Sequence, residues 1–250
     1  MIYLLLTNKA LSREIIVVRG NDNYPPYEMN VAGQLVGFHI DLITQVAKTL
    51  DMRARFESYP WKRAIYMVRE GLVDAISFIS ETEHRSEFVI FTPGNELSIA
   101  KIALIVLKSK KSIFNFNGHN LKTLSHYTFG HNLGFSYGDF YDKSKLNKKT
   151  FNTYDQLFSS LRLERIDLAL VDYDAFEHFQ MSAQGITHKL VALDKKVAIA
   201  NYIAFSKKMK LQKLSAKFAK AMLEYKKSEG FFALIKKYKL EASKVSNFPL

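Results

Sequence analysis

The stretch WKRAIYMVREGLVDAISFI, residues 61–79, contains a complete transition from helix to strand. Residues 61–71 predict a helix that ends at Gly71, because glycine readily adopts the left-handed conformation that closes a helix. Residues 73–79, VDAISFI, are mostly apolar and predict a buried strand. A helix followed at once by a buried strand is one step of an alternating α/β fold.

The elements before this stretch continue the alternation. EIIVVRG (residues 14–20) and ARFESY (54–59) predict strands, and GQLVGFHIDLITQVAKTLDM (33–52) predicts a turn and a helix with an apolar stripe. NDNYPPYEMN (21–30) predicts a loop, because two consecutive prolines exclude a helix there. The β-α-β-α-β order predicts a mostly parallel sheet with helices on both faces.

The pattern partly repeats in the second half of the chain. Strands are predicted at 101–108, 127–133 and 166–172, with a helix at 154–164. GLVDAISF (71–78) and ERIDLALV (164–171) each place an aspartate, Asp74 and Asp167, between the end of a helix and an apolar strand. We therefore expect two lobes of similar plan.

The two lobes are not separated by a low-complexity linker, so strands or short segments must connect them. A last strand at 200–208 and two helices predict that the chain returns to the first lobe. We expect residues 1–98 and 201–250 to form lobe 1, residues 99–200 to form lobe 2, and the hinges to lie near 98–100 and 198–201.

Composition excludes several classes of protein. The net charge is +12, and 12 lysines against 3 glutamates lie between Lys207 and Lys244. Apolar residues at steps of three and four over 211–225 place these lysines on the solvated face of an amphipathic helix, so we do not expect nucleic-acid binding. The absence of cysteine excludes disulfides, thiolate nucleophiles and cysteine-ligated metals.

Membrane association, if present, is expected to be peripheral, because no apolar run approaches the roughly 18 residues of a membrane-spanning helix. The first dozen residues, MIYLLLTNKALS, fit either the remnant of an export signal or a leading segment.

Polar side chains follow two predicted strands at the edge where parallel sheets bind ligands. Thr82 and Arg85 come directly after the strand at 73–79, and a guanidinium can donate two parallel hydrogen bonds to a carboxylate. Asp172 ends the matching strand of the second lobe. A cation in one lobe and an anion in the other suit a zwitterion such as an amino acid. Alternatively, Ser80 or Thr82 caps a short helix and Arg85 belongs to a surface ion pair.

Several motifs, in this order and spacing, resemble the bacterial extracellular solute-binding proteins of the polar amino-acid type, which serve ABC importers and some sensors. The resemblance covers about Glu14 to Leu240 and rests on GNDNYPPYEM, GQLVGFHIDLI, GLVDAI followed by TEHR and FVIFTP, ERIDLALVD, and YIAFSKK leading to SEGFFALIKKY. It implies the type II periplasmic-binding fold, in which two lobes joined by two crossover strands close on a ligand.

The resemblance also implies roles for single residues. Arg85 is similar to the carboxylate-binding arginine of the family and Asp172 to its ammonium-binding acid. The further ligand-binding residues that we expect are Ser80, Thr82, Tyr24, Asp22, Trp61 and Ser136. Tyr24 and Trp61 match aromatic walls, and Ser136 matches a second-lobe hydroxyl, or a backbone turn, that reaches the carboxylate. The chain departs from the family pattern at Phe135 and at Phe78 and Ile79, where many members have small polar residues, so the identity of the ligand stays open.

The implied function is that of a periplasmic binding protein for an amino acid or a small carboxylate, working with a membrane permease or a sensor. We expect a monomer without catalytic residues, metal or other cofactor. The alternative is an enzyme on the same fold, similar to cyclohexadienyl dehydratase, with Glu28, Glu81, His84 or Asp172 as proton-transfer candidates. His119, His126 and His131 lie close in sequence, but their spacing matches no metal site.

Overall fold

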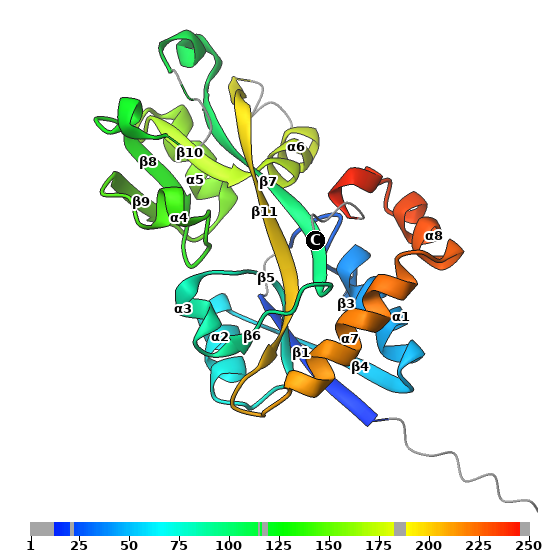
Figure 1. Cartoon of the computed structure of the whole chain (residues 1–250). Coiled ribbons are helices and arrows are strands. Elements are labelled where there is room, and N and C mark those ends of the chain that lie inside the picture. The colour runs from blue at the N-terminus through cyan, green and yellow to red at the C-terminus, as the bar shows by residue number, and fades with distance from the viewer. Residues whose placement is uncertain (1–12, 21–22, 115, 117–119, 183–188, 246–250) are drawn as a thin grey trace, which may run out of the picture.

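The computed structural model describes residues 13–20, 23–114, 116, 120–182 and 189–245. It is a mixed α/β structure in which two long strands run through two lobes (Figure 1). Asp22, which we expected to contact ligand, and His119 lie outside the described residues. Within the described residues, no helix has the length and apolar content needed to cross a membrane.

The first lobe is built on three parallel strands, with the N-terminal strand in the middle. The strands are β1 (Arg13–Gly20), β4 (Met52–Tyr59) and β5 (Ala75–Ser80). Its helices are α1 (Phe38–Thr49), α2 (Trp61–Arg69), α3 (Glu83–Ser86), α7 (Gln212–Tyr225) and α8 (Glu229–Lys237). A short strand, β6 (Val89–Ile90), and a 3-10 turn, η3 (Ala242–Lys244), complete it.

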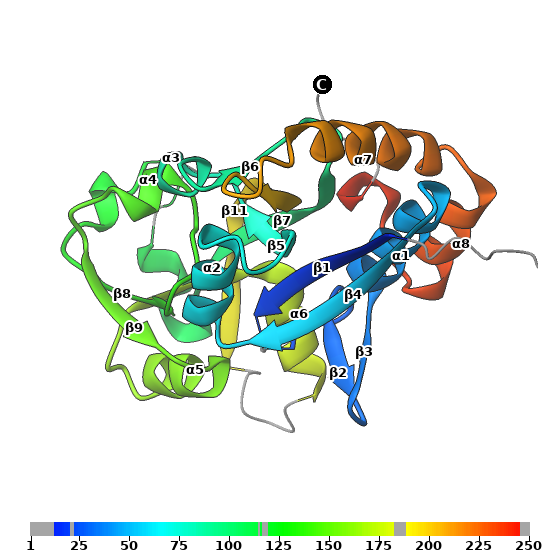
Figure 2. The same cartoon turned by 90° about the horizontal axis from the view of Figure 1, so that it is seen from below.

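Strand β1 shows why this lobe needs helices on both faces. Ile15 and Val17 face one core with α1, α7 and α8, whereas Val18 faces a second core with α2. Figure 2 shows α1 and α2 on opposite sides of the sheet. Because the strand is buried on both faces, its residues form a continuous apolar run in the sequence.

The second lobe repeats this plan. Its parallel strands are β10 (Leu168–Asp172), β8 (Thr128–Asn132) and β9 (Asn147–Phe151). Its helices are α4 (Asp139–Asp142), α5 (Tyr154–Arg162) and α6 (Tyr173–Ser182), with 3-10 turns η1 (Lys108–Ile113) and η2 (Lys122–Leu124). Apolar side chains form one core on each face of its sheet. The predicted two-lobed α/β fold is thus confirmed.

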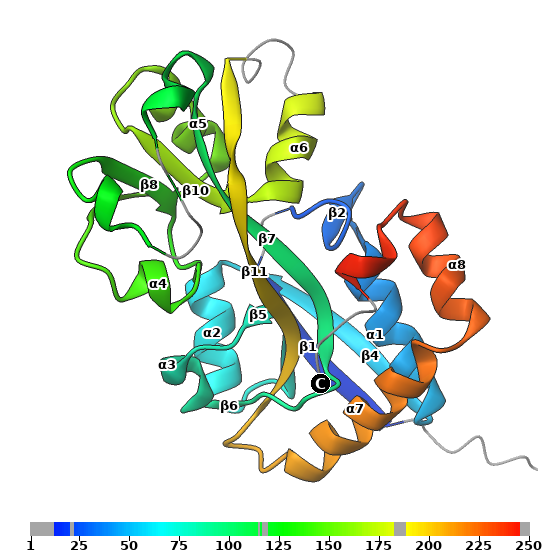
Figure 3. The same ribbon diagram turned by 45° about the horizontal axis from the view of Figure 1, so that its top comes forward.

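The lobes are joined by β7 (Glu96–Leu107) and β11 (Leu190–Ser206), which pair with each other in antiparallel fashion (Figures 1 and 3). Ser98 lies opposite Asn201, and Ala100 lies opposite Ile199. Both strands are longer than the sequence predicts. The lobe boundaries at 98–99 and 200–201 stay a prediction.

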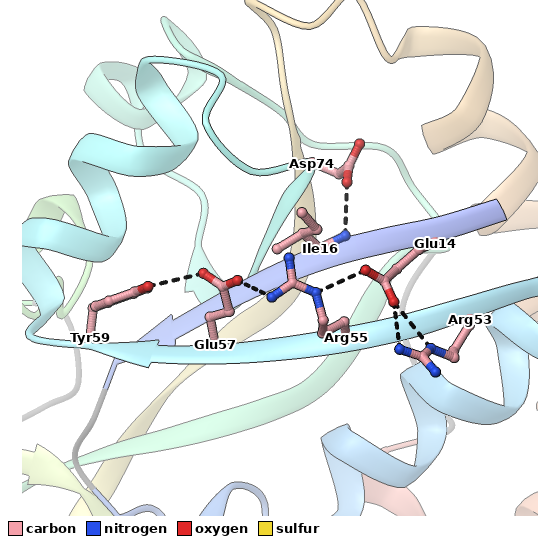
Figure 4. A network of polar contacts seen from close by, with 7 residues as sticks. All are labelled: Glu14, Ile16, Arg53, Arg55, Glu57, Tyr59 and Asp74. Carbon is pink, nitrogen blue, oxygen red and sulfur yellow. Dashed lines mark hydrogen bonds and ion pairs between the residues drawn. The ribbon is translucent and has the colours of Figure 1, made fainter.

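Strand β4 is an edge strand of the described sheet and carries charges on its solvent side (Figure 4). Arg53 and Arg55 both bind Glu14 of β1, and Arg55 also binds Glu57. Phe56 points the other way and packs against the core. Charged side chains on an edge strand discourage pairing with another chain.

The loop predicted at 21–30 and the turn after it contain a hairpin that the sequence reading missed. β2 (Met29–Val31) pairs with β3 (Gln34–Val36). The loop itself is tied together by hydrogen bonds between Tyr24 and Glu28. It therefore presents Tyr24 and Tyr27 in fixed positions at the end of β1.

Helix α7 has the amphipathic pattern predicted for it. Leu211, Leu214, Phe218 and Met222 are buried, and most lysines around them are exposed. Lys226 is an exception: it is 9% exposed and donates to the carbonyl oxygen of Glu96 at 2.6 Å.

Candidate functional site

A cavity of about 70 Å³ lies between the lobes and is lined by both of them and by both crossing strands. Its lining residues are Arg19, Gly20, Tyr24, Glu28, Trp61, Phe78, Ser80 and Arg85 from the first lobe, Phe135, Ser136, Tyr137, Tyr154 and Asp172 from the second, and Ala100, Ile102, Ile199 and Asn201 from β7 and β11. The carboxyl ends of β1, β5 and β10 meet here, as expected for ligand sites in α/β sheets.

Arg85 reaches this cavity from α3 and is only 9% exposed. Its Nη1 donates to the carbonyl oxygen of Ser80 at 2.9 Å and to Ser80 Oγ at 2.7 Å, and its Nη2 donates to the carbonyl oxygen of Gly134 at 3.4 Å. Burial lowers its pKa to about 10, so the guanidinium is still charged at neutral pH. Among the described residues, no carboxylate lies within ion-pair distance of it. The site therefore holds a buried cation that lacks an anion.

Ser80 and Thr82 both position Arg85, but in different ways. Ser80 lines the cavity and accepts from the guanidinium. Thr82 is the N-cap of α3, where its Oγ1 accepts the backbone N–H of Arg85 at 3.2 Å. Its side chain lies in a neighbouring surface depression rather than in the cavity. The capping alternative thus describes Thr82 correctly, whereas the alternative that Arg85 belongs to a surface ion pair is wrong.

Asp172 faces the same cavity from the last position of β10 and is 7% exposed. Its Oδ1 accepts the backbone N–H groups of Asp174 at 2.9 Å and Ala175 at 3.2 Å, so it caps α6. Burial and the nearby Asp174 raise its pKa to about 7. Within the described ranges, no lysine or arginine forms an ion pair with Asp172. An acid that lacks a cation therefore faces the same space as a cation that lacks an acid.

Aromatic side chains form the walls between these two charges. Tyr24 packs on Phe78, with ring centroids 4.7 Å apart, and on Phe135 at 5.5 Å. Its hydroxyl lies 3.1 Å from the hydroxyl of Tyr154 in the other lobe. The guanidinium carbon of Arg85 lies 5.6 Å from the ring of Trp61. Phe78 has a φ of 54°, a strained backbone that holds its ring in the wall.

Ser136 lies at the rim, where its hydroxyl donates to Asp142. The other carboxylate oxygen of Asp142 accepts the N–H of Tyr137 at 3.1 Å. The structure thus brings together Arg85, Ser80, Asp172, Tyr24, Trp61 and Ser136 around one cavity.

Arg19 and Glu28 line the cavity as part of a buried polar network, of which the sequence reading named only Glu28. Arg19 Nε donates to Glu28 at 2.9 Å, and His39 Nδ1 lies 3.3 Å from the same carboxylate. Burial lowers the pKa of His39, so the ring is neutral at pH 7. His39 Nε2 lies 2.9 Å from Ser98 Oγ on β7. The sequence contained one sign of this network. Arg19 ends the apolar run EIIVVRG, and an arginine at the end of a buried strand indicates a buried acidic partner.

Of the four proton-transfer candidates, Asp172 faces the cavity, as described above. Glu28, one of the proton-transfer candidates, is held between Arg19 and His39, whereas Glu81 and His84 are exposed and do not line the cavity. No group of three histidine or acidic side chains in the described part of the chain could hold a metal ion.

The sequence is similar to those of known solute-binding proteins. The sequence model of the bacterial extracellular solute-binding proteins, family 3, matches residues 16–241. The arginine-binding periplasmic protein of Mannheimia haemolytica is 25% identical over 183 residues, which are 71% of this chain and 70% of that protein. The histidine-binding periplasmic protein of Salmonella typhimurium is 28% identical over 157 residues, 60% of this chain; the match spans 57% of that protein.

Solved structures support the fold. A variant of the arginine-binding protein ArgBP from T. maritima superposes with a TM-score of 0.70 at 22% identity, covering 90% of this chain and 95% of that one. A histidine kinase sensor domain with similarity to periplasmic binding proteins gives a TM-score of 0.71 at 20% identity, covering 91% and 96%. At these identities the likeness concerns the fold alone.

Proposed function

Because the chain belongs to the bacterial extracellular solute-binding proteins, family 3, we propose that its ligand is an amino acid bound as a zwitterion in the cavity between the lobes. The observation that carries this proposal is the pair Arg85 and Asp172, two buried side chains of opposite charge that face one cavity and form no ion pair among the described residues. The curated relatives, named for arginine and histidine binding, support the same ligand class.

The carboxylate of the ligand binds the Arg85 guanidinium, whose orientation Ser80 fixes, and the ammonium binds Asp172. Charge-assisted hydrogen bonds of this kind are strong in a cavity that excludes water. Tyr24 and Trp61 contact the apolar part of the ligand, and the Ser136 hydroxyl adds a contact to the carboxylate from the second lobe. Thr82 acts indirectly, by holding the backbone that carries Arg85.

Binding closes the lobes by bending at two places, near Ser98–Ala100 and Ala198–Asn201. Residues 98–100 lie opposite residues 199–201 in the paired strands β7 and β11, which supports a common hinge axis. Lobe 1 then comprises residues 1–98 and 201–250, and lobe 2 comprises residues 99–200.

The protein works in the periplasm and delivers its ligand to a membrane permease or reports it to a sensor. The named relatives are periplasmic proteins, and one structural neighbour is a sensor domain, so both roles exist on this fold. The family and the curated relatives are binding proteins and lend no support to the dehydratase-like alternative.

A thermal-shift screen against the amino acids, small carboxylates and polyamines tests the proposal. Ligand at about a hundred times its Kd adds about 2.7 kcal/mol to the free energy of unfolding, which raises Tm by roughly 5–10 °C. Arg85→Ala and Asp172→Asn should each abolish the shift. Arg63→Ala, which removes an exposed arginine of α2, should keep it. A flat screen with well-folded wild-type protein would overturn the zwitterion site.

A further inference from the structure

A second set of contacts joins the lobes outside the ligand cavity. Asp174, in the first turn of α6, accepts a hydrogen bond from the hydroxyl of Tyr27 at 2.7 Å and one from Lys244 Nζ at 2.6 Å. Asp174 is 9% exposed and Tyr27 is 3% exposed. None of these three residues lines the cavity. We propose that Asp174, Tyr27 and Lys244 form a closure latch that raises ligand affinity without touching the ligand.

The latch connects elements that belong to different lobes. Asp174 belongs to the second lobe, whereas Tyr27 lies in the loop after β1 and Lys244 in the 3-10 turn near the C-terminus. The hydrogen bond from Lys244 thus joins the C-terminal segment, red in Figure 1, to the start of α6. The next residue, Val245, is fully buried in the core of the first lobe, so Lys244 is firmly anchored.

The latch also connects directly to the residues that hold the ligand. The backbone N–H of Asp174 donates to Asp172 Oδ1 at 2.9 Å, so the same residue orients the ammonium-binding acid. On the other side, the N–H of Tyr27 donates to the carbonyl oxygen of Tyr24 at 2.7 Å, and the Tyr27 ring stacks on Phe78. Asp174 and Tyr27 are thus positioning residues for Asp172 and for the aromatic wall.

Burial makes these contacts stronger than the exposed ion pair that also joins the lobes. The ion pair of Lys143 with Glu83 also joins the lobes, but both side chains are more than half exposed. Exposed pairs contribute little, whereas hydrogen bonds to a buried carboxylate are strong. The apparent affinity of a protein that must close is reduced by the fraction of molecules that are open. Losing the latch therefore weakens binding through the open–closed equilibrium.

This inference rests on the proposed amino-acid site, and its test uses Tyr27→Phe and Lys244→Met, which leave Asp174 and the cap of α6 intact. With the amino acid found in the thermal screen, calorimetry should give a Kd roughly tenfold higher for each variant. Ligand dissociation should be faster, with association unchanged. Lys143→Met and Tyr66→Phe, which change an exposed pair and an exposed ring, should bind like wild type.

Small-angle scattering separates a latch from a general structural defect. Without ligand, both latch variants should have a larger radius of gyration than wild type; at saturating ligand, all should reach the same closed value. Wild-type affinity and equal unliganded radii in both variants would overturn the latch. If wild type binds no amino acid, the proposed ligand fails, and the unliganded radii alone decide the latch, with equal radii rejecting it.

Discussion

Asp74 and Asp167 make the same pair of hydrogen bonds in the two lobes. The Asp74 carboxylate accepts the N–H of Ile16 at 2.8 Å (Figure 4). The backbone N–H of Asp74 donates to the carbonyl oxygen of Ile16 at 3.0 Å. The Asp167 carboxylate accepts the N–H of Thr128 at 2.8 Å, and its N–H donates to the carbonyl oxygen of Thr128 at 2.9 Å. Each aspartate thus fixes the start of one strand against the neighbouring parallel strand.

Asp74→Ala and Asp167→Ala should each lower the free energy of unfolding by about 1–3 kcal/mol, because each leaves a backbone N–H without its acceptor. Chemical denaturation measures this loss. Asp194→Ala removes an exposed aspartate on the surface and should change stability by less than about 0.5 kcal/mol. Equal stability of all three variants would show that the paired bonds do not hold the strands.

Ligand affinity should depend on pH through Asp172. Its pKa in the fold is raised from 3.8 to about 7, so the protonated form stabilises the unliganded protein below about pH 4, and this contribution is lost as the pH rises to about 7. The ligand ammonium instead favours the ionised form. Lowering the pH from about 7.5 to about 5.5 should therefore raise Kd roughly 25-fold and make binding release a proton.

Calorimetry in two buffers of different ionisation enthalpy measures the number of protons released on binding. Lys226, whose pKa burial lowers to about 7, titrates over the same range but does not line the cavity. Asp172→Asn keeps Lys226 and should bind weakly with no pH dependence. A constant Kd over this range in wild type would argue against an ammonium on Asp172.

Gly134→Ala should weaken binding by hindering closure. Gly134 belongs to the second lobe, has a φ of +83°, and a Cβ there would lie 2.8 Å from Trp61 Cδ1 of the first lobe. Gly33→Ala is a matched control, because Gly33 has the same φ and no atom within 4 Å of its added Cβ. Both variants should lose about 1 kcal/mol of stability from backbone strain.

In titrations with ligand, only Gly134→Ala should show a roughly tenfold or greater rise in Kd, because overpacking costs about 1–3 kcal/mol. Equal affinities of the two variants would place Gly134 outside the closing interface.

Much of the fold could be predicted from local pattern. Gly71, with a φ of +68°, ends its helix as expected, and the buried strands follow apolar runs. The full length of β11 could not be predicted, because Asp194 and the lysines after it are exposed and polar where the strand passes over the surface. The hairpin β2–β3 was not predicted for the same reason, because half of its side chains are exposed and the rest are only partly buried.

The charged residues of the site could be predicted because they follow strands whose carboxyl ends meet. Arg85 and Asp172 were found in this way. The sequence did not indicate Tyr154 and Tyr137 as site residues. An aromatic residue within an apolar pattern is normally assigned to the core, and only the arrangement of the two lobes shows that these two line the cavity. The contact of Asp174 with Tyr27 spans 147 residues, and no sequence spacing indicates it.

A thermodynamic cycle on Arg85 tests the central claim most directly. Calorimetry should compare wild type and Arg85→Ala, each with the amino acid that gives the largest thermal shift and with the corresponding amine, which lacks the carboxylate. In wild type, loss of the carboxylate should weaken binding roughly a hundredfold, and in Arg85→Ala by less than roughly fivefold, a coupling of about 2 kcal/mol between guanidinium and carboxylate. Equal binding of amino acid and amine to wild type would contradict the account.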